Sequence, residues 1–204
     1  MSRNLAPKAK AALAFKPRTG RAVLVVLAEE KGELRVMERA EIPLLPAGEM
    51  APYHAADGLE PKAADKYVKA AVARAQGLAK DALRKAAKRC VDSGHDLCGC
   101  AVLVGKGMPE WTTGEILAVH VRMHAAEGEM FREVLVEAAR ACGMEPTTLP
   151  DKTAIDSAAK KLGVTRARLD ADLAALGKTA GPPWGKYQKE AAAAALVVLK
   201  GGLK

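Results

Sequence analysis

The sequence predicts an α/β fold with a mixed five-stranded sheet flanked by helices. Three strand-like segments come first, and helices then alternate with two further strands. The element order is therefore β-β-β-α-β-α-β-α, with a small helical insert at about 151–180 before the last helix. Antiparallel strands followed by strand–helix alternation are typical of a mixed sheet with helices on its faces. The 204 residues suffice for one domain, which we expect over 11–204 behind a flexible, basic N-terminus at 1–10.

Strand-like apolar segments separated by short turns define the first three strands. They are predicted at 11–17, 20–30 and 33–45. Gly32, within the sequence EKGE, marks a hairpin turn between the second and third strands. In the third strand Leu34 and Val36 alternate with Arg35 and Arg39, which is typical of a half-exposed strand near the sheet edge.

The remaining elements follow from helical periodicity and from turn residues. Apolar residues at spacings of three and four predict a long helix at 62–91 and a second one at about 112–141. The three prolines of 44–61 predict that this segment is mostly loop. Short strands are expected at 97–105 and 144–150, short helices capped by Asp151 and Thr165 at 151–163 and 165–178, and a last helix at 186–200.

Composition and charge exclude some classes of protein and permit others. Aromatic residues make up only 3% of the chain, which argues against binding of single-stranded nucleic acid by base stacking. The net charge of +8 permits contact with nucleic acid or another polyanion. The longest apolar run has nine residues, too few for a membrane span, and the N-terminus has no signal-peptide stretch, so we expect a cytoplasmic protein. The four cysteines lack paired CxxC spacing and are expected to be reduced and buried rather than zinc ligands.

Three segments resemble the layout of one known superfamily. LAFKPRTGRAVLVVL is similar to its opening hairpin, and KYQKEAAAAALVVL is similar to its last, alanine-rich helix. The stretch from ILAVHVRMHAAEGEM to KKLGVT is similar to its long helix, short strand and basic helical insert. By this layout nearly the whole chain resembles the ribonuclease H-like fold, and within it the RuvC-type Holliday-junction resolvases. The resemblance implies nucleic acid as a partner and carboxylates that hold two divalent cations.

The resemblance does not extend to most of those carboxylates. The aspartate of the first strand falls on Lys16, which cannot hold a metal ion and would repel it. The fourth strand ends in the sequence GKG at 105–107 instead of an acid. The last helix keeps one of its two acids, Glu190, because the other position is Tyr187. Junction cleavage by this chemistry is therefore not expected, and either the scaffold has lost its site or a different site is built on it.

Two sequences of the form His-Ala-Ala-acid-Gly are the candidates for a different site. His54 and Asp57 belong to the first, in the predicted loop. His124 and Glu127 belong to the second, in the second long helix, where His120 lies on the same apolar side. One interpretation is structural, with Glu127 and a histidine satisfying each other. The other is a catalytic acid–base cluster (His54, Asp57, His124, Glu127). A divalent metal, which the sequence permits but does not require, would be bound by His120, His124 and Glu127.

The predicted helix at 62–91 carries most of the net charge. Its residues 62–89 include nine Lys or Arg against two Asp, a local excess of +7. The candidate phosphate contacts are Lys66, Lys69, Lys80, Arg84, Lys85 and Lys88. The alternative is a solvated helix whose long side chains cover an alanine-rich surface. Residues 158–178, with Arg166 and Arg168 after a glycine turn, also have a helix-turn-helix pattern, although such hairpins are common as plain packing units.

Three hypotheses on function follow from these observations. The leading one is a nucleic-acid-associated domain that is not an active resolvase. The first alternative is a small enzyme or metal-binding protein that uses the histidines and acids of 53–58 and 116–132. The second is a structural or interaction domain without a site of its own. The sequence leaves the substrate and the oligomeric state open, a homodimer included.

Overall fold

Five strands form one mixed sheet in the order β3-β2-β1-β4-β5. The computed structural model describes residues 9–49 and 51–201. The strands are β1 (Lys10–Arg18), β2 (Arg21–Glu30), β3 (Glu33–Pro43), β4 (Asp96–Val104) and β5 (Thr147–Pro150). β1, β2 and β3 are antiparallel neighbours, whereas β4 runs parallel to β1 and β5 runs parallel to β4. The predicted α/β fold with a mixed sheet is confirmed.

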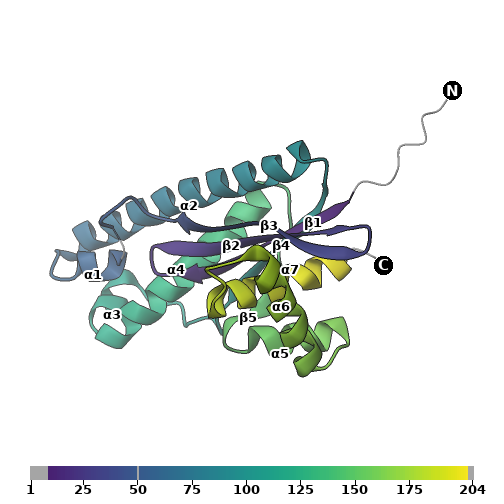
Figure 1. Ribbon diagram of the computed structural model, residues 1–204. Coiled ribbons are helices and arrows are strands. Elements are labelled where there is room, and N and C mark those ends of the chain that lie inside the picture. The colour runs from purple at the N-terminus through teal and green to yellow at the C-terminus, as the bar shows by residue number, and fades with distance from the viewer. Residues whose placement is uncertain (1–8, 50, 202–204) are drawn as a thin grey trace.

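The helices follow the predicted order (Figure 1). They are α1 (Pro52–Ala56), α2 (Pro61–Asp92), α3 (Thr113–Leu117), α4 (His120–Ala141), α5 (Ala154–Leu162), α6 (Arg166–Ala180) and α7 (Lys186–Gly201). A 3-10 turn, η1 (Asp151–Thr153), joins β5 to α5, so the helical insert expected at 151–180 is present. Among the described residues, no helix combines the length and the hydropathy needed to cross a membrane.

The two faces of the sheet bury two separate cores, and β1 contributes to both by alternation. Leu13 and Phe15 point to the face covered by α2 and α4. Ala12 and Ala14 point to the opposite face, which is covered by α5, α6 and α7. Figure 1 shows α2 on one side of the sheet and α5–α7 on the other. Because side chains alternate along a strand, Lys16 continues the face of Ala12 and Ala14 and is directed towards α7.

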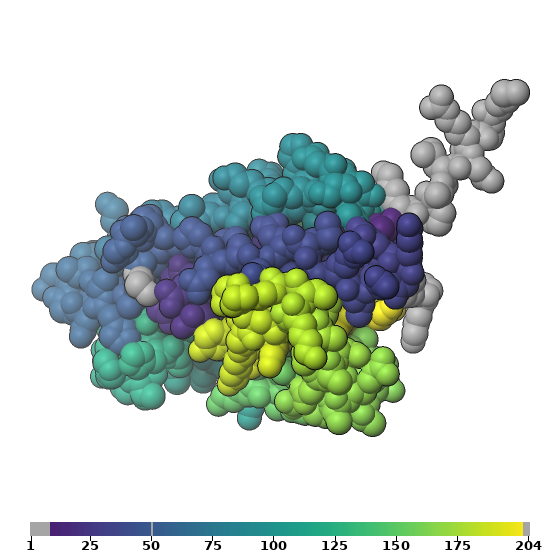
Figure 2. Space-filling view, viewed as in Figure 1, coloured from purple at the N-terminus to yellow at the C-terminus, as the bar shows by residue number. Residues whose placement is uncertain are grey.

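The edge of the sheet is formed by β3, as its alternating sequence predicts. Its exposed and partly buried residues alternate over most of its length. In the space-filling view β3 lies between α2 and the α6 segment, which covers part of it (Figure 2). Arg39 on β3 donates a hydrogen bond to the carbonyl oxygen of Pro183 at 2.7 Å, which ties the edge strand to the segment after α6. The insert therefore packs on the sheet edge as well as on α7.

Three boundaries differ from the predictions. The segment at 44–61 contains a short helix, α1, because Pro52 stands at a helix start, where its fixed backbone angle is favourable. The helix expected at 112–141 is two helices, α3 and α4. A capping box between Thr112 and Glu115 starts α3, and Val119 then adopts an extended conformation that separates it from α4. Of the N-terminus predicted to be flexible, residues 1–8 lie outside the described residues, and Lys10 already pairs with Glu29 in the sheet.

Candidate functional site

Lys16 lies between two carboxylates at one end of the sheet. Its Nζ forms an ion pair with Asp151, which directly follows β5, and lies 3.4 Å from Glu190 Oε2 on α7. Asp151 Oδ2 lies 3.7 Å from Nη2 of Arg132 on α4. We call Lys16, Arg132, Asp151 and Glu190 the lysine–acid cluster. It joins residues of β1, α4, η1 and α7 at the end of β1 and β5.

Burial explains why these charges occur together. Lys16 and Glu190 are only 7% and 6% exposed, and a buried charge without an opposite charge is strongly destabilising. Glu190 Oε2 is buried and accepts no hydrogen bond from any residue that the structure describes, so its stabilisation comes from the nearby Lys16 ammonium. The ring of Tyr187, one turn of α7 before Glu190, faces two cations. Lys16 Nζ lies 5.6 Å and Arg18 Cζ lies 4.4 Å from its centroid.

The lysine–acid cluster does not fit a pair of divalent cations. The Lys16 ammonium is already paired with both Asp151 and Glu190. At the end of β4, a Cβ added to Gly105 would lie 2.9 Å from Glu129 Oε2 and 2.9 Å from Arg132 Nη1. The space for an acid side chain at Gly105 is therefore filled by an ion pair from α4, in which Glu129 and Arg132 approach to 3.2 Å. Side-chain cations neutralise these carboxylates in place of metal ions.

Sequence patterns identified only part of this cluster. Lys16 and Glu190 were singled out through the resemblance, but Asp151 was expected to cap a helix. Thr153 is instead the residue before α5, and Asp151 turns towards Lys16. The topology could have identified Asp151. It follows β5, and the carboxyl ends of the parallel strands β1, β4 and β5 lie at one edge of the sheet. Arg132 was not among the candidate residues, yet its side chain is only 23% exposed and lies beside Asp151.

Three histidines meet beside α1. His54 belongs to α1, and His120 and His124 belong to the first two turns of α4. One potential ligand atom from each lies within 4.8 Å of the other two, and the Nε2 atoms of His120 and His124 are 3.1 Å apart. We call these three residues the histidine cluster. The sequences around His54 and His124 therefore do meet.

Glu127 completes this region from the buried side. It is 3% exposed, and its Oε1 accepts hydrogen bonds from His54 Nδ1 at 2.9 Å and from the His54 backbone N–H at 3.3 Å. The contact between Glu127 and a histidine that the structural interpretation expects is present. Asp57 does not take part, because it is exposed and ends α1.

The expectation that His120 and His124 lie on a buried side is wrong. Both are exposed, because the first turns of α4 lie beside the short helices α1 and α3, away from the middle of the sheet (Figure 1). The buried side of α4 begins with Met123, Ala126 and Glu127. The sequence correctly indicated which side of α4 faces the core. At the start of α4, however, only the short helices α1 and α3 pack against that side, and they leave His120 and His124 exposed.

The basic side of α2 is exposed along most of its length. Lys66, Lys69, Arg84, Lys85 and Lys88 are exposed, and Lys80 is half-buried. Lys69 pairs with Asp65 at 2.6 Å and Lys88 pairs with Asp92 at 2.7 Å. Lys66, Arg84 and Lys85 form no ion pair with any residue that the structure describes. We call the six residues the basic face of α2.

The helix-turn-helix pattern of the insert is formed by α5 and α6. Gly163 joins them in the left-handed conformation, with φ of 68°. Their arginines are held by acids of the same two helices. Arg166 donates to Asp156 at 2.6 Å and to Asp170 at 2.9 Å, and Arg168 donates to Asp172 at 3.0 Å. These guanidinium groups are less available to phosphates than the unpaired cations of α2.

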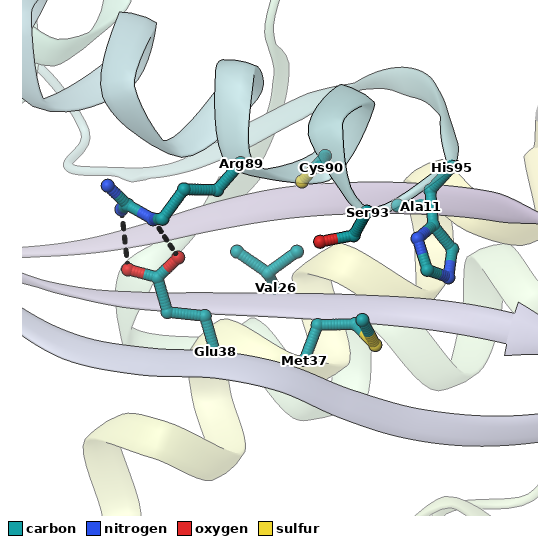
Figure 3. A pocket seen from close by; sticks show the side chains of 8 residues that line it. All are labelled: Ala11, Val26, Met37, Glu38, Arg89, Cys90, Ser93 and His95. Carbon is teal, nitrogen blue, oxygen red and sulfur yellow. Dashed lines mark hydrogen bonds and ion pairs between the residues drawn. The ribbon is translucent and has the colours of Figure 1, made fainter.

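A cavity of about 340 Å³ lies between the end of α2 and β3 (Figure 3). Arg89 bridges it through two hydrogen bonds to Glu38, at 2.9 and 2.6 Å. His95, the fourth histidine, borders the cavity and lies 2.9 Å from Glu30 through its Nε2. It follows the C-terminus of α2, whereas the histidine cluster lies near the N-terminus of this 32-residue helix. A helix of that length spans about 48 Å, so His95 belongs to a separate environment.

The cysteines are free thiols, and their surroundings oppose metal binding. Burial raises the pKa of the Cys100 thiol to about 12, and burial also raises the pKa values of Cys90 and Cys98. Because the thiolate is the metal ligand, these shifts oppose metal binding. Cys90 and Cys100 are buried as expected, whereas Cys98 and Cys142 are only half-buried. Among the described residues, the potential metal-binding group is the histidine cluster.

Comparison with known proteins identifies the fold. No protein-family model and no curated protein matches the chain. The structure of Thermus thermophilus RuvC in complex with a Holliday junction substrate matches 92% of this chain and 91% of its own, with a TM-score of 0.50 and 11% identity. The Thermus thermophilus RuvC structure matches 95% of this chain and 96% of its own, with a TM-score of 0.51 and 14% identity. The chain therefore has the ribonuclease H-like fold in its RuvC-type layout.

Proposed function

We propose that the protein binds duplex or branched nucleic acid and does not cut it with the two-metal chemistry of junction resolvases. The observation that carries the proposal is the lysine–acid cluster within a RuvC-type fold. The remaining acids, Asp151 and Glu190, are paired with Lys16, and the acid position after β4 is Gly105. A domain in this state keeps the scaffold and replaces the metal ions with an internal ammonium group.

Charge repulsion opposes metal binding at this site. A divalent cation would have to approach the Lys16 ammonium, which lies within ion-pair distance of both acids, and Arg132 lies 3.7 Å from Asp151. Metal binding would require expelling buried Lys16 from its two partners, which costs several kcal/mol for an ion of this size. The two-metal mechanism needs carboxylates that are free to bridge cations, and this arrangement does not offer them.

The basic face of α2 supports the binding part of the proposal. Lys66 and Lys88 are 22 residues apart, which is about 33 Å along a helix and close to one turn of duplex DNA. Lys66, Arg84 and Lys85 are exposed without an ion-pair partner among the described residues, so they can contact phosphates without breaking an existing contact. The matched Thermus thermophilus RuvC structure contains a Holliday junction substrate, which makes branched DNA the first ligand to test.

The experiment measures fluorescence anisotropy of a labelled four-way junction and of a labelled duplex at several salt concentrations. Binding should weaken steeply between 50 and 200 mM salt, roughly in proportion to the number of phosphate contacts. Arg84→Glu with Lys85→Glu should reduce affinity at least tenfold and lower the salt slope by about 2. The matched control is Lys160→Glu with Lys161→Glu, the same charge change on exposed lysines of α5. Equal losses in both double variants would contradict a role for the basic face of α2, and no binding at low salt would contradict the proposal itself.

Cleavage is tested on the same junction with Mg²⁺ or Mn²⁺. No product is expected from the wild-type chain. Products that disappear in Glu190→Gln would show that the acids of the lysine–acid cluster still support cleavage, and the second half of the proposal would then be wrong. Products that persist in Glu190→Gln would point to a contaminating nuclease. The same products should then also persist in Lys16→Met and in Asp151→Asn.

A further inference from the structure

The histidine cluster gathers three imidazoles around one small volume. The ring centroids of His54 and His124 are 4.5 Å apart, those of His120 and His124 are 4.7 Å apart, and those of His54 and His120 are 5.0 Å apart. One ligand atom from each ring lies within 4.8 Å of the other two. Three separate side chains that place ring nitrogens together in this way are arranged like the ligands of a metal ion.

The protons of this cluster leave nitrogen lone pairs free. Glu127 Oε1 only accepts hydrogen bonds when it is ionised, so the hydrogen of its 2.9 Å bond to His54 belongs to Nδ1. In the neutral ring this leaves Nε2 as the unprotonated nitrogen, and His54 Nε2 is buried without a hydrogen-bond partner among the described residues. A buried acceptor of this kind is satisfied by a proton donor or by a metal ion.

His120 and His124 face each other through their Nε2 atoms at 3.1 Å. Two protonated Nε2 atoms would bring two hydrogens together, so at most one of these nitrogens carries a proton. A tetrahedral zinc ion with Zn–N bonds of about 2.05 Å would place two ligand nitrogens about 3.3 Å apart. The observed separation therefore needs only a small opening of two exposed side chains to admit the ion.

Glu127 holds His54 in the orientation that metal binding requires. Its two hydrogen bonds, to Nδ1 and to the backbone N–H of His54, fix both the ring and the start of α1. Metal-binding histidines commonly donate their second ring N–H to a carboxylate, which sets the tautomer and raises the basicity of the ligating nitrogen. Glu127 is therefore a positioning residue, and the third ligand is His54 rather than Glu127.

We infer that His54, His120 and His124 bind one divalent zinc-class ion, with Glu127 as the carboxylate that orients His54. Three imidazole nitrogens favour Zn²⁺, Ni²⁺ or Cu²⁺ over Mg²⁺ and Ca²⁺, which prefer oxygen ligands. Because His120 and His124 are exposed, a fourth coordination position faces solvent and takes water or a ligand. Bound Zn²⁺ would also link α1 to the start of α4, two elements that are 66 residues apart at His54 and His120.

The test uses the full chain without a histidine tag, treated with a chelator and desalted, and titrated calorimetrically with ZnCl₂ in the absence of nucleic acid. One Zn²⁺ per chain is expected, together with a rise in melting temperature of a few degrees at saturating metal. MgCl₂ should give no binding. Glu127→Gln should lower the affinity for Zn²⁺ by about 10- to 100-fold, and His120→Ala and His124→Ala should each lower it further.

The matched control is His95→Gln, which removes a histidine that also contacts a glutamate, Glu30 at 2.9 Å, but has no other histidine beside it (Figure 3). Its affinity for Zn²⁺ should equal that of the wild-type chain. His120→Ala and His124→Ala change exposed residues, so far-ultraviolet circular dichroism should confirm that both variants fold. The inference is overturned if the double variant His120→Ala/His124→Ala binds Zn²⁺ as tightly as the wild-type chain, or if the wild-type chain does not bind it. Because no nucleic acid is present, either result is independent of the proposed DNA binding.

Discussion

The lysine–acid cluster and the histidine cluster balance their buried carboxylates in different ways. In the lysine–acid cluster, Lys16 supplies a positive charge that is already part of the chain, and its partners Asp151 and Glu190 are occupied. Beside the histidine cluster a single buried carboxylate, Glu127, contacts one imidazole, and His54 Nε2 has no hydrogen-bond partner within 9–49 and 51–201. The carboxylates of the first cluster are already neutralised by Lys16, whereas the imidazoles of the second can still bind a cation.

This difference shows that the residue types present do not by themselves define a metal site. Carboxylates are strong ligands for divalent cations, yet a neighbouring ammonium group removes that capacity. Neutral imidazoles carry no charge that a lysine could neutralise, so a cluster of them keeps its ligand capacity even in a basic protein.

The largest expected effect is the loss of the ammonium group from the lysine–acid cluster. Lys16→Met leaves Asp151 and Glu190 without their shared cation in a site where Glu190 is only 6% exposed. Removal of one partner from a buried ion pair costs about 3–5 kcal/mol of unfolding free energy. Urea unfolding followed by circular dichroism measures the loss.

Two further variants serve as controls for the stability loss in Lys16→Met. Lys85→Met, at an exposed position without an ion pair among the described residues, should change stability by no more than about 0.5 kcal/mol. The triple variant Lys16→Met/Asp151→Asn/Glu190→Gln should recover much of the lost stability, because no buried charge remains unpaired. A loss below about 1 kcal/mol in Lys16→Met would show that water reaches the acids, and the acids would then not depend on Lys16 for their neutralisation.

A smaller effect is expected when charge is removed from the histidine cluster. Glu127→Gln keeps an amide oxygen that can accept from His54 Nδ1 and from the His54 backbone N–H. In the presence of a chelator, the free energy of unfolding should therefore fall by only about 1 kcal/mol. Glu30→Gln, beside His95, is the matched control at the other histidine–glutamate contact, and it should cost less because Glu30 is 34% exposed. A loss in Glu127→Gln as large as that of Lys16→Met would remove the contrast between the two clusters.

The fold was predictable because its signals are local. The short apolar runs of β1 and β2, the alternation in β3 and the helical periodicity of α2 and α4 each arise within one segment. The break between α3 and α4 was missed because both helices share one apolar phase, and only the extended backbone of Val119 separates them. The short helix α1 was missed because its prolines predict a loop, although Pro52 serves as a helix start.

The candidate sites were predictable only in part because their contacts are long-range. Lys16 and Asp151 are 135 residues apart, and no local pattern relates them. The meeting of His54 with the α4 histidines was predicted from two similar sequences, and the geometry agrees. The absence of Asp57 from the cluster depends on the end of α1, a boundary that sequence patterns do not locate.

The smallest expected effect concerns a carboxylate that is paired with neither a lysine nor a histidine. Glu133 on α4 lies one turn from Glu129 and one turn from Glu137. Burial raises the pKa of Glu133, and the negative charges of Glu129 and Glu137 raise it further. No ion pair joins Glu133 to a cation among the residues that the structure describes. It therefore differs from Glu190, which has Lys16, and from Glu127, which has His54.

The sign of the pH dependence follows from this raised pKa. The folded protein holds the Glu133 proton more tightly than the unfolded chain, so the side chain adds stability at acidic pH and loses that contribution as pH rises through its folded pKa. Glu133→Gln should thus be more stable than the wild-type chain at pH 7, by about 0.3 kcal/mol, or about 1 °C in melting temperature. The difference should shrink as pH approaches the ordinary glutamate value of about 4.3. Glu145→Gln should show the opposite sign, because its hydrogen bonds to Arg140 lower the pKa of Glu145. If Glu133→Gln is less stable than the wild-type chain at pH 7, Glu133 contacts a cation in solution, and its contrast with Glu190, which is paired with Lys16, then disappears.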